Sequence, residues 1–209
     1  MTNKELEKEL KELRAMVEKH IKLESSGTVQ LKNWNEYDWD ELGNMVGSGE
    51  NLNFKIDNEQ VKEIELYTGE KVEVVCYENN AGCMKFACVI DGLWRMNDTG
   101  TNAGGYEASK MATVYVPRFK KLMPADMTYF DFKLPGYDEL LNNPILQNLI
   151  KEHKEVSSWW WTTQPQRTTG FSIAYIDVGV SISADANYSN GVVLCFKIQN
   201  QKNPQLKGC

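Results

Sequence analysis

The first 24 residues carry the most regular pattern of hydrophobic and polar positions in the chain. Leu6, Leu10, Leu13 and Val17 are spaced by four, three and four residues, with Lys and Glu between them. This is the spacing of a coiled-coil seam, so we predict an amphipathic helix over residues 2–24. One alternative is that this helix packs on its own domain. The other is that it associates with copies of itself or docks into a larger assembly, and we favour this one because the apolar stripe is narrow and both its flanks are heavily charged.

The pattern changes at residues 24–27, where Glu-Ser-Ser-Gly supplies a short linker and a glycine suited to end a helix. Aromatic residues and short alternating segments follow. We therefore predict two parts, an N-terminal helix over 1–27 for oligomerisation or anchoring and a globular domain over 28–209.

Strict alternation of apolar and polar residues predicts strands at the start of the globular domain. Turns rich in Gly, Asn and Asp separate them, as in an antiparallel meander. The predicted strands of this group are 61–67, 71–78, 84–90 and 93–96.

The middle of the domain has two helical patterns, and strands return after them. The first helix, over 106–122, contains Pro117, which must stand at a break or in a first turn. The second, over 137–153, is interrupted or started at Asn143-Pro144. The later strands are predicted at 158–162, 171–176, 178–182 and 191–198. Strands, then helices, then strands predict an α+β fold with antiparallel sheets.

The charge balance of the chain limits the classes of partner that we expect. The 209 residues include 29 acidic and 23 basic side chains, which give a net charge of −6. This balance argues against nucleic acid or an anionic membrane surface as partners. No apolar run approaches the roughly 18–20 residues of a membrane span, and the charged N-terminus lacks a signal peptide, so we expect synthesis in the cytosol. Of five cysteines, Cys88 and Cys195 are predicted to be buried free thiols.

Catalytic and metal-binding patterns are scarce, so we predict no enzyme activity, no metal and no cofactor. The two histidines, His20 and His153, lie in no metal-binding motif. Asp91, Asn97, Asp98 and Asn102 offer oxygens for calcium without EF-hand spacing, and a surface loop is the favoured interpretation.

A carboxylate pair for glycoside hydrolysis is the other catalytic alternative. Asp38, Asp40 and Glu41 surround Trp39, but an acidic helix start explains this pattern better.

Three consecutive tryptophans, Trp159, Trp160 and Trp161, are the most unusual local feature. On a strand, successive side chains point to opposite faces, so one or two of them are predicted to face outward or into a cleft. Core or interface packing is the favoured interpretation, and direct ligand contact is the alternative.

Residues 157–165, which contain the three tryptophans, and the glycine-rich residues 96–106 resemble two motifs of a domain family common in phages and prophages. Residues 157–165, Ser-Ser-Trp-Trp-Trp-Thr-Thr-Gln-Pro, are similar to its S-x-W-W-L-R-S-P run. Residues 96–106, Met-Asn-Asp-Thr-Gly-Thr-Asn-Ala-Gly-Gly-Tyr, are similar to its M-N-x-T-x-T-N-x-G-G-W stretch. The resemblance covers about residues 55–198 and implies a C-type-lectin-like fold with small antiparallel sheets, flanking helices and long loops.

The chain departs from this family at several positions. Thr162 and Thr163 replace its Leu and Arg. Gln164-Pro165-Gln166 differs from the Gln-Pro-Asp motif of calcium-dependent lectins, and no cysteine suits the chemistry of a formylglycine-generating enzyme. We therefore predict neither calcium-dependent sugar binding nor that enzyme activity.

The resemblance implies a virion protein that binds a glycan or protein on the host surface. The narrow seam and the viral setting favour a homotrimer, joined to other virion proteins by its N-terminal helix. A structural role without ligand binding, as a capsid decoration or head-fibre protein, is the alternative. The predicted ligand-binding residues are Trp94, Asn97, Asn102, Tyr106, Trp159, Trp161, Arg167 and Tyr188.

Overall fold

The computed structural model describes residues 33–48, 56–57, 59–80, 83–124, 128–175 and 182–199. The chain divides after Leu31, and every described residue belongs to the second unit, Lys32–Cys209. The predicted helix over 2–24 and its seam, Leu6, Leu10, Leu13 and Val17, lie outside the described residues. No helix in the described part is both long enough and apolar enough to cross a membrane.

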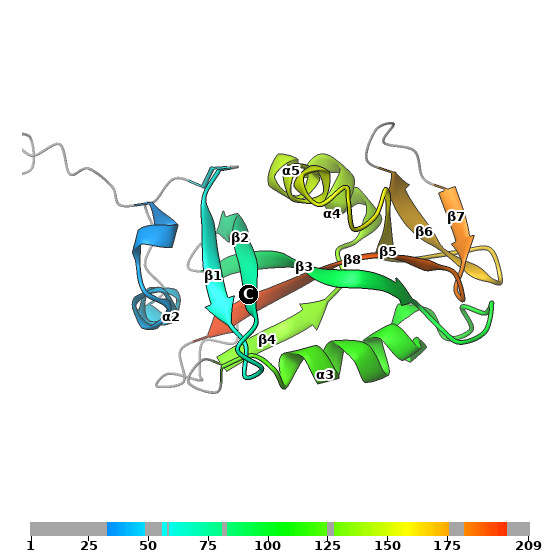
Figure 1. Cartoon of the computed structure of the whole chain (residues 1–209), viewed down its shortest axis with the longest axis horizontal. Helices are drawn as coiled ribbons and strands as arrows, with labels where there is room; N and C mark the ends of the chain where they lie inside the picture. The colour runs from blue at the N-terminus through cyan, green and yellow to red at the C-terminus, as the bar shows by residue number, and fades with distance from the viewer. Residues whose placement is uncertain are drawn as a thin grey trace, which may run out of the picture. The chain divides into compact units, whose positions relative to one another are not determined.

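The described strands form one mixed sheet (Figure 1). Along the sheet the order is β1-β2-β3-β8-β5-β6-β7, and β4 pairs with β8 as well. All pairings are antiparallel except that of β5 with β8, where Trp160 lies opposite Gly191. The strands are β1 (Val61–Glu65), β2 (Lys71–Asn80), β3 (Cys83–Arg95), β4 (Thr128–Lys133), β5 (Trp159–Gln166), β6 (Gly170–Tyr175), β7 (Ile182–Asp185) and β8 (Ser189–Gln199).

The α+β class is confirmed, with corrections in detail. The predicted strands at 84–90 and 93–96 are one strand, β3, whose register with β8 shifts between Ile90 and Trp94. Asp91-Gly92 is thus an irregularity inside a strand and not a turn. Strand β4 was not predicted, and the strand expected at 178–182 falls mainly outside the described residues.

The sheet is buried on both faces. On one face, Val74, Phe86, Cys88 and their neighbours belong to a core shared with Leu42 and Phe119. On the other face, residues of the same strands pack against two helices, α4 (Tyr137–Asn142) and α5 (Pro144–Glu152). Figure 1 shows α4 and α5 on one side of the sheet and α3 (Val116–Lys120) on the other.

The helix predicted over 106–122 is divided. It consists of a 3₁₀ turn, η2 (Tyr106–Ala108), a π-helical turn, η3 (Met111–Tyr115), and α3. Pro117 stands in the first turn of α3, as predicted. The helical pattern over 137–153 is interrupted at Asn143-Pro144, one of the two predicted alternatives. Asn143 caps α5 by accepting from the backbone N–H of Ile145 and Leu146 at 3.0 and 3.1 Å.

Two helical elements precede the sheet, the 3₁₀ turn η1 (Trp34–Glu36) and α2 (Trp39–Ser48). The acidic start of α2 is a capping arrangement, as the favoured interpretation predicts. Asp38 Oδ1 accepts from the Glu41 N–H at 2.6 Å, and Glu41 Oε2 accepts from the Asp38 N–H at 3.0 Å. These carboxylates are therefore engaged at a helix terminus.

Candidate functional site

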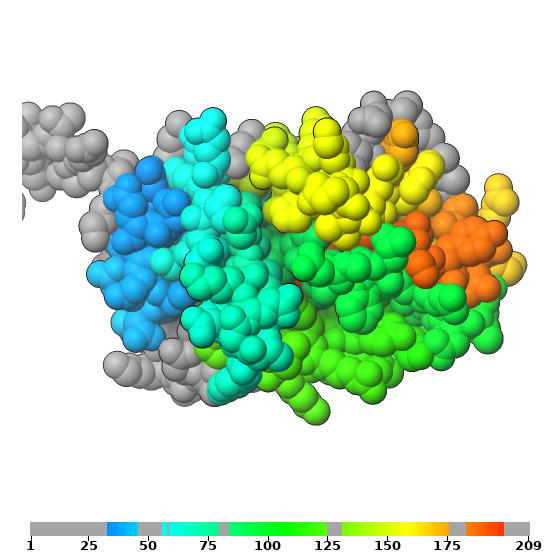
Figure 2. All heavy atoms as spheres, viewed as in Figure 1, coloured from blue at the N-terminus to red at the C-terminus, as the bar shows by residue number. Residues whose placement is uncertain are grey.

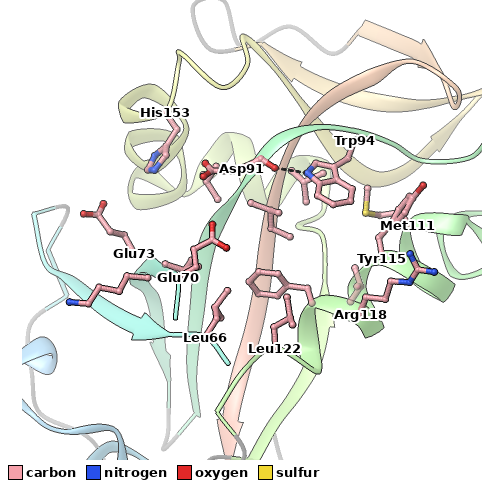
Figure 3. Close-up of a pocket in the computed structure, with 17 residues that line it drawn as sticks. Leu66, Glu70, Glu73, Asp91, Trp94, Met111, Tyr115, Arg118, Leu122 and His153 are labelled. Carbon is pink, nitrogen blue, oxygen red and sulfur yellow. Dashed lines mark hydrogen bonds between the residues drawn. The ribbon is translucent and has the colours of Figure 1, made fainter. Parts of the chain in front are cut away.

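A pocket of about 410 Å³ opens between β2, β3 and the helical segment of residues 111–122 (Figure 3). We call it the fork pocket. Figure 2 shows the hollow near the centre of the drawn face, between the strands at the start of the sheet and the segments that follow β3. Concavity, size and an apolar lining are typical of ligand sites.

The fork pocket exists because β2 and β3 separate at one end. Their ladder ends at the pair Val74–Cys88, although β2 begins at Lys71 and β3 continues to Arg95. Among the described strands, residues 71–73 pair only with β1, and residues 89–90 only with β8. The register shift after Ile90, with Gly92 at φ 86°, bends β3 at this point.

The floor of the fork pocket is apolar. Buried side chains from four elements or their flanks meet there, and the register places Val192 of β8 directly opposite Ile90. These floor residues are Leu66, Met111, Val116, Phe119 and Val192. An apolar ligand group that enters here would leave water for a preformed apolar surface.

Two aromatic side chains form one wall. The rings of Trp94 and Tyr115 meet edge to face with centroids 5.2 Å apart. The Trp94 Nε1–H donates to the carbonyl oxygen of Asp91 at 2.9 Å, as the dashed line in Figure 3 shows. This bond fixes the indole ring before any ligand arrives.

The strand side of the rim is acidic. Glu70, Glu73 and Asp91 line it, and no basic side chain of the described residues lies within ion-pair distance of them. Lys71 is paired elsewhere: its Nζ lies 2.7 Å from Glu63 Oε2, and this hydrogen bond raises the pKa of Lys71. Arg118 lies on the helix side (Figure 3).

His153, just after α5, completes the rim. Its Nδ1 lies 2.9 Å from the carbonyl oxygen of Leu149. A carbonyl oxygen only accepts, so Nδ1 carries the hydrogen, and Nε2 is the acceptor in the neutral ring.

Of the eight predicted ligand-binding residues, Trp94 alone lines the fork pocket. Three others hold loops. Asn97 Oδ1 accepts from the Lys110 N–H at 2.7 Å, and the Tyr106 hydroxyl accepts from the Leu134 N–H at 3.1 Å. Asn102 Nδ2 lies 3.3, 2.9 and 2.7 Å from the carbonyl oxygens of residues 166, 167 and 170, respectively.

The remaining four predicted residues do not form one site with Trp94. Trp161 is completely buried, and its Nε1–H donates to the carbonyl oxygen of Trp94 at 2.7 Å. Trp159 is half-buried against Tyr175, with ring centroids 4.4 Å apart. Arg167 and Tyr188 are exposed. Ligand contact by these residues stays a prediction.

The candidate calcium oxygens are already engaged in part. The two carboxylate oxygens of Asp98 accept from Lys110 Nζ at 2.6 and 2.8 Å. The Asn97 amide donates to the carbonyl oxygen of Thr101 and accepts from the Lys110 N–H. In the described part of the chain, no three His, Cys, Asp or Glu residues converge as metal ligands would.

A second, smaller cavity of about 60 Å³ is polar. The Tyr77 hydroxyl donates to Glu139 Oε1 at 3.0 Å, and Lys85 Nζ lies 2.6 Å from Glu78 and 3.9 Å from Glu139. Burial raises the pKa of Tyr77 and of the nearby Cys195 thiol, so both stay protonated near neutral pH. These contacts join α4 to β2 and β3, and we assign them a structural role.

Comparison of the chain with known protein families, characterised proteins and solved structures finds no match.

Proposed function

We propose that the globular domain is a C-type-lectin-like binding module of a bacteriophage or prophage particle, and that the fork pocket contacts the host cell surface. The N-terminal helix joins three copies and anchors them in the particle. The observation that carries the binding role is the fork pocket itself, with its buried apolar floor, fixed aromatic wall and acidic rim.

Two contacts support the C-type-lectin-like assignment, since each ties one of the two motifs that carry the resemblance to residues that adjoin the other motif. Asn102, in the glycine-rich stretch, donates to the backbone at the turn between β5 and β6. Trp161, in the tryptophan motif, donates to the carbonyl oxygen of Trp94, two residues before the other motif. The two segments are thus one structural unit around β8.

A binding role is favoured over catalysis by the location of the perturbed titratable groups. Catalytic acids, bases and nucleophiles commonly have shifted pKa values inside a cleft. In the described residues, the groups with large shifts are Tyr77, Cys88, Tyr106 and Cys195, and none of them lines the fork pocket.

Gold-labelled antibody against residues 29–209, applied to particles from the source strain, tests the virion role. Label at the tail tip or baseplate is the expected result. Label spread over the capsid would instead favour the decoration or head-fibre alternative, and unlabelled particles would contradict both.

Cell attachment tests the role of the fork pocket. Val72 is a half-buried residue of the pocket lining, and Val72→Arg places a long charged side chain there. We expect particles that carry this variant to lose adsorption to host cells. The matched control is Thr99→Arg, which adds the same charge at an exposed residue outside the lining. Normal adsorption of correctly assembled Val72→Arg particles would contradict a binding role for this pocket.

A further inference from the structure

The two strands that border the fork pocket face each other without pairing. In the register of the β2–β3 ladder, Val72 would lie opposite Ile90, but the ladder stops at Val74 and Cys88. A strand segment that lacks a neighbour presents unpaired N–H and C=O groups, and these can accept an added strand. The fork therefore offers backbone hydrogen-bonding positions beside a side-chain pocket.

The side chains around these edges favour an apolar group over a sugar. None of the seventeen lining residues is Ser, Thr, Asn or Gln, and the floor is aliphatic and aromatic. The charged side chains of the lining lie at the rim, so sugar hydroxyls that face the floor would lose hydrogen bonds to water without replacement there. A Leu, Phe or Met side chain has no such cost.

The rim adds a preference for charge. Glu70, Glu73 and Asp91 lie on the strand side, and no cation of the described residues is paired with them. Lys or Arg next to the apolar side chain would complement this edge.

We propose that the fork pocket binds an extended polypeptide segment that adds as a strand along the free edge of β2 or β3. One apolar side chain of that segment enters between Trp94 and Phe119, and a neighbouring Lys or Arg lies at the acidic edge. The proposal rests on the proposed function, because it names a protein and not a glycan as the surface partner.

The first test uses the full chain to select from a library of random peptides about ten residues long, the length of a long strand. Selection against Val72→Arg in parallel removes peptides that bind elsewhere, and Thr99→Arg is the matched control. We expect wild type and Thr99→Arg to enrich the same peptides, with an apolar residue beside Lys or Arg, and Val72→Arg to lose them.

The second test distinguishes strand addition from simple apolar capture. Each selected peptide is methylated at one backbone nitrogen at a time. Every second position of a strand bonds to a given neighbour, so affinity should fall roughly three- to tenfold at alternate positions only. Uniform tolerance of methylation would overturn strand addition.

Charge is tested without disturbing the floor. Glu70→Gln with Glu73→Gln should weaken peptide binding about three- to tenfold at low salt, with a smaller effect at high salt. Glu59→Gln with Glu107→Gln removes the same charge at exposed residues outside the lining and should have no effect. Equal effects of the two double variants would contradict recognition by the rim.

The outcomes separate this proposal from the proposed function. If wild type enriches no peptide over Val72→Arg, polypeptide recognition is overturned. If Val72→Arg abolishes both particle adsorption and binding to a purified host glycan, the host-binding role stands while the polypeptide proposal fails. If peptides bind as expected but adsorption is unchanged in Val72→Arg, the polypeptide proposal stands and the host-binding role fails.

Discussion

Two glycines are required by close packing at single positions in the sheet. A Cβ at Gly191 would lie 2.6 Å from Trp160 Cε3 and 2.8 Å from Ser157 Cβ, and one at Gly170 would clash with the backbone oxygen of Ala184. We expect Gly191→Ala to lower the free energy of unfolding by about 1–3 kcal/mol, since the fully buried indole has no space to move.

Urea denaturation measures this effect, and Gly43→Ala is the control. Gly43 lies in α2 with no atom within 4 Å of an added Cβ, so alanine there should stabilise the protein by up to about 1 kcal/mol. A neutral Gly191→Ala would show that Trp160 is not held as tightly as the structure indicates.

Buried thiols and phenols make stability depend on alkaline pH. Burial raises the pKa of Cys88 and of Tyr106 to about 12, and it raises the pKa of Cys195 and Tyr77 in the same direction. The unfolded chain therefore loses these protons first. The stability that they contribute is complete below pH about 9, and it is lost as pH rises from there through the folded-state pKa values.

Urea denaturation between pH about 9 and 11 should show unfolding free energy falling with pH. Cys88→Ala removes one such group and should flatten the slope by up to about 1.4 kcal/mol per pH unit. Tyr188→Phe, which removes an exposed hydroxyl, is the control and should leave the slope unchanged. An unchanged slope in Cys88→Ala would contradict the role of the buried thiol.

At the scale of the element, Asn143 divides two helices and ties them to the sheet. Its side chain caps α5, and its Nδ2 donates to the carbonyl oxygen of Tyr77 at 3.0 Å. Asn143→Ala should cost about 1–2 kcal/mol of unfolding free energy, since it removes the cap and leaves a partly buried carbonyl without this partner. Thermal denaturation measures the loss.

The adjacent Asn142→Ala is the control for this prediction. Asn142 is exposed at the end of α4, and its replacement should change stability by less than about 0.5 kcal/mol. Equal losses in the two variants would contradict the capping role of Asn143.

Local signals predicted the elements that depend on neighbouring residues. The acidic helix start at Asp38, the helix boundary at Asn143-Pro144 and the place of Pro117 at a break or in a first turn were predicted, because in each case a side chain bonds within its own segment or fixes its own φ angle. The continuity of β3 through Asp91-Gly92 could not be predicted from local sequence. Both halves of this strand are held by pairing with β8, which lies more than 90 residues away in the sequence. Strand β4 also depends on pairing with the distant strand β8, and its local sequence therefore did not predict it.

The fork pocket could not be predicted for a related reason. Alternation places Glu73 and Val72 on opposite faces of a continuous sheet, but the pocket gathers both at the point where the sheet separates. Trp94 was predicted as a ligand-binding residue because it adjoins the stretch 96–106, which carries the family resemblance. Glu70, Phe119 and His153 come from three distant segments, and nothing in their local sequence joins them.

At the scale of the whole molecule, two-sided burial explains the tryptophan run. Trp160 and Trp161 point to opposite faces, yet both are fully buried, because each face has its own core. Of the three tryptophans in the run, only Trp159 is partly exposed to solvent. The prediction that one or two tryptophans face outward assumed that one face of the sheet is exposed to solvent. Helices α4 and α5 cover that face, so the assumption does not hold.

The two cores share strands, so we expect them to unfold together. Cys88 on β3 belongs to one core and Cys195 on β8 to the other, and the two strands are hydrogen-bonded neighbours. Two variants, each retaining one of these thiols with the other four cysteines replaced, allow each core to be followed by thiol labelling in urea. Both labelling midpoints should coincide with the change in tryptophan fluorescence, because neither face can open while the strands remain paired. Earlier labelling of Cys195 would instead show that the α4–α5 layer detaches as a separate unit.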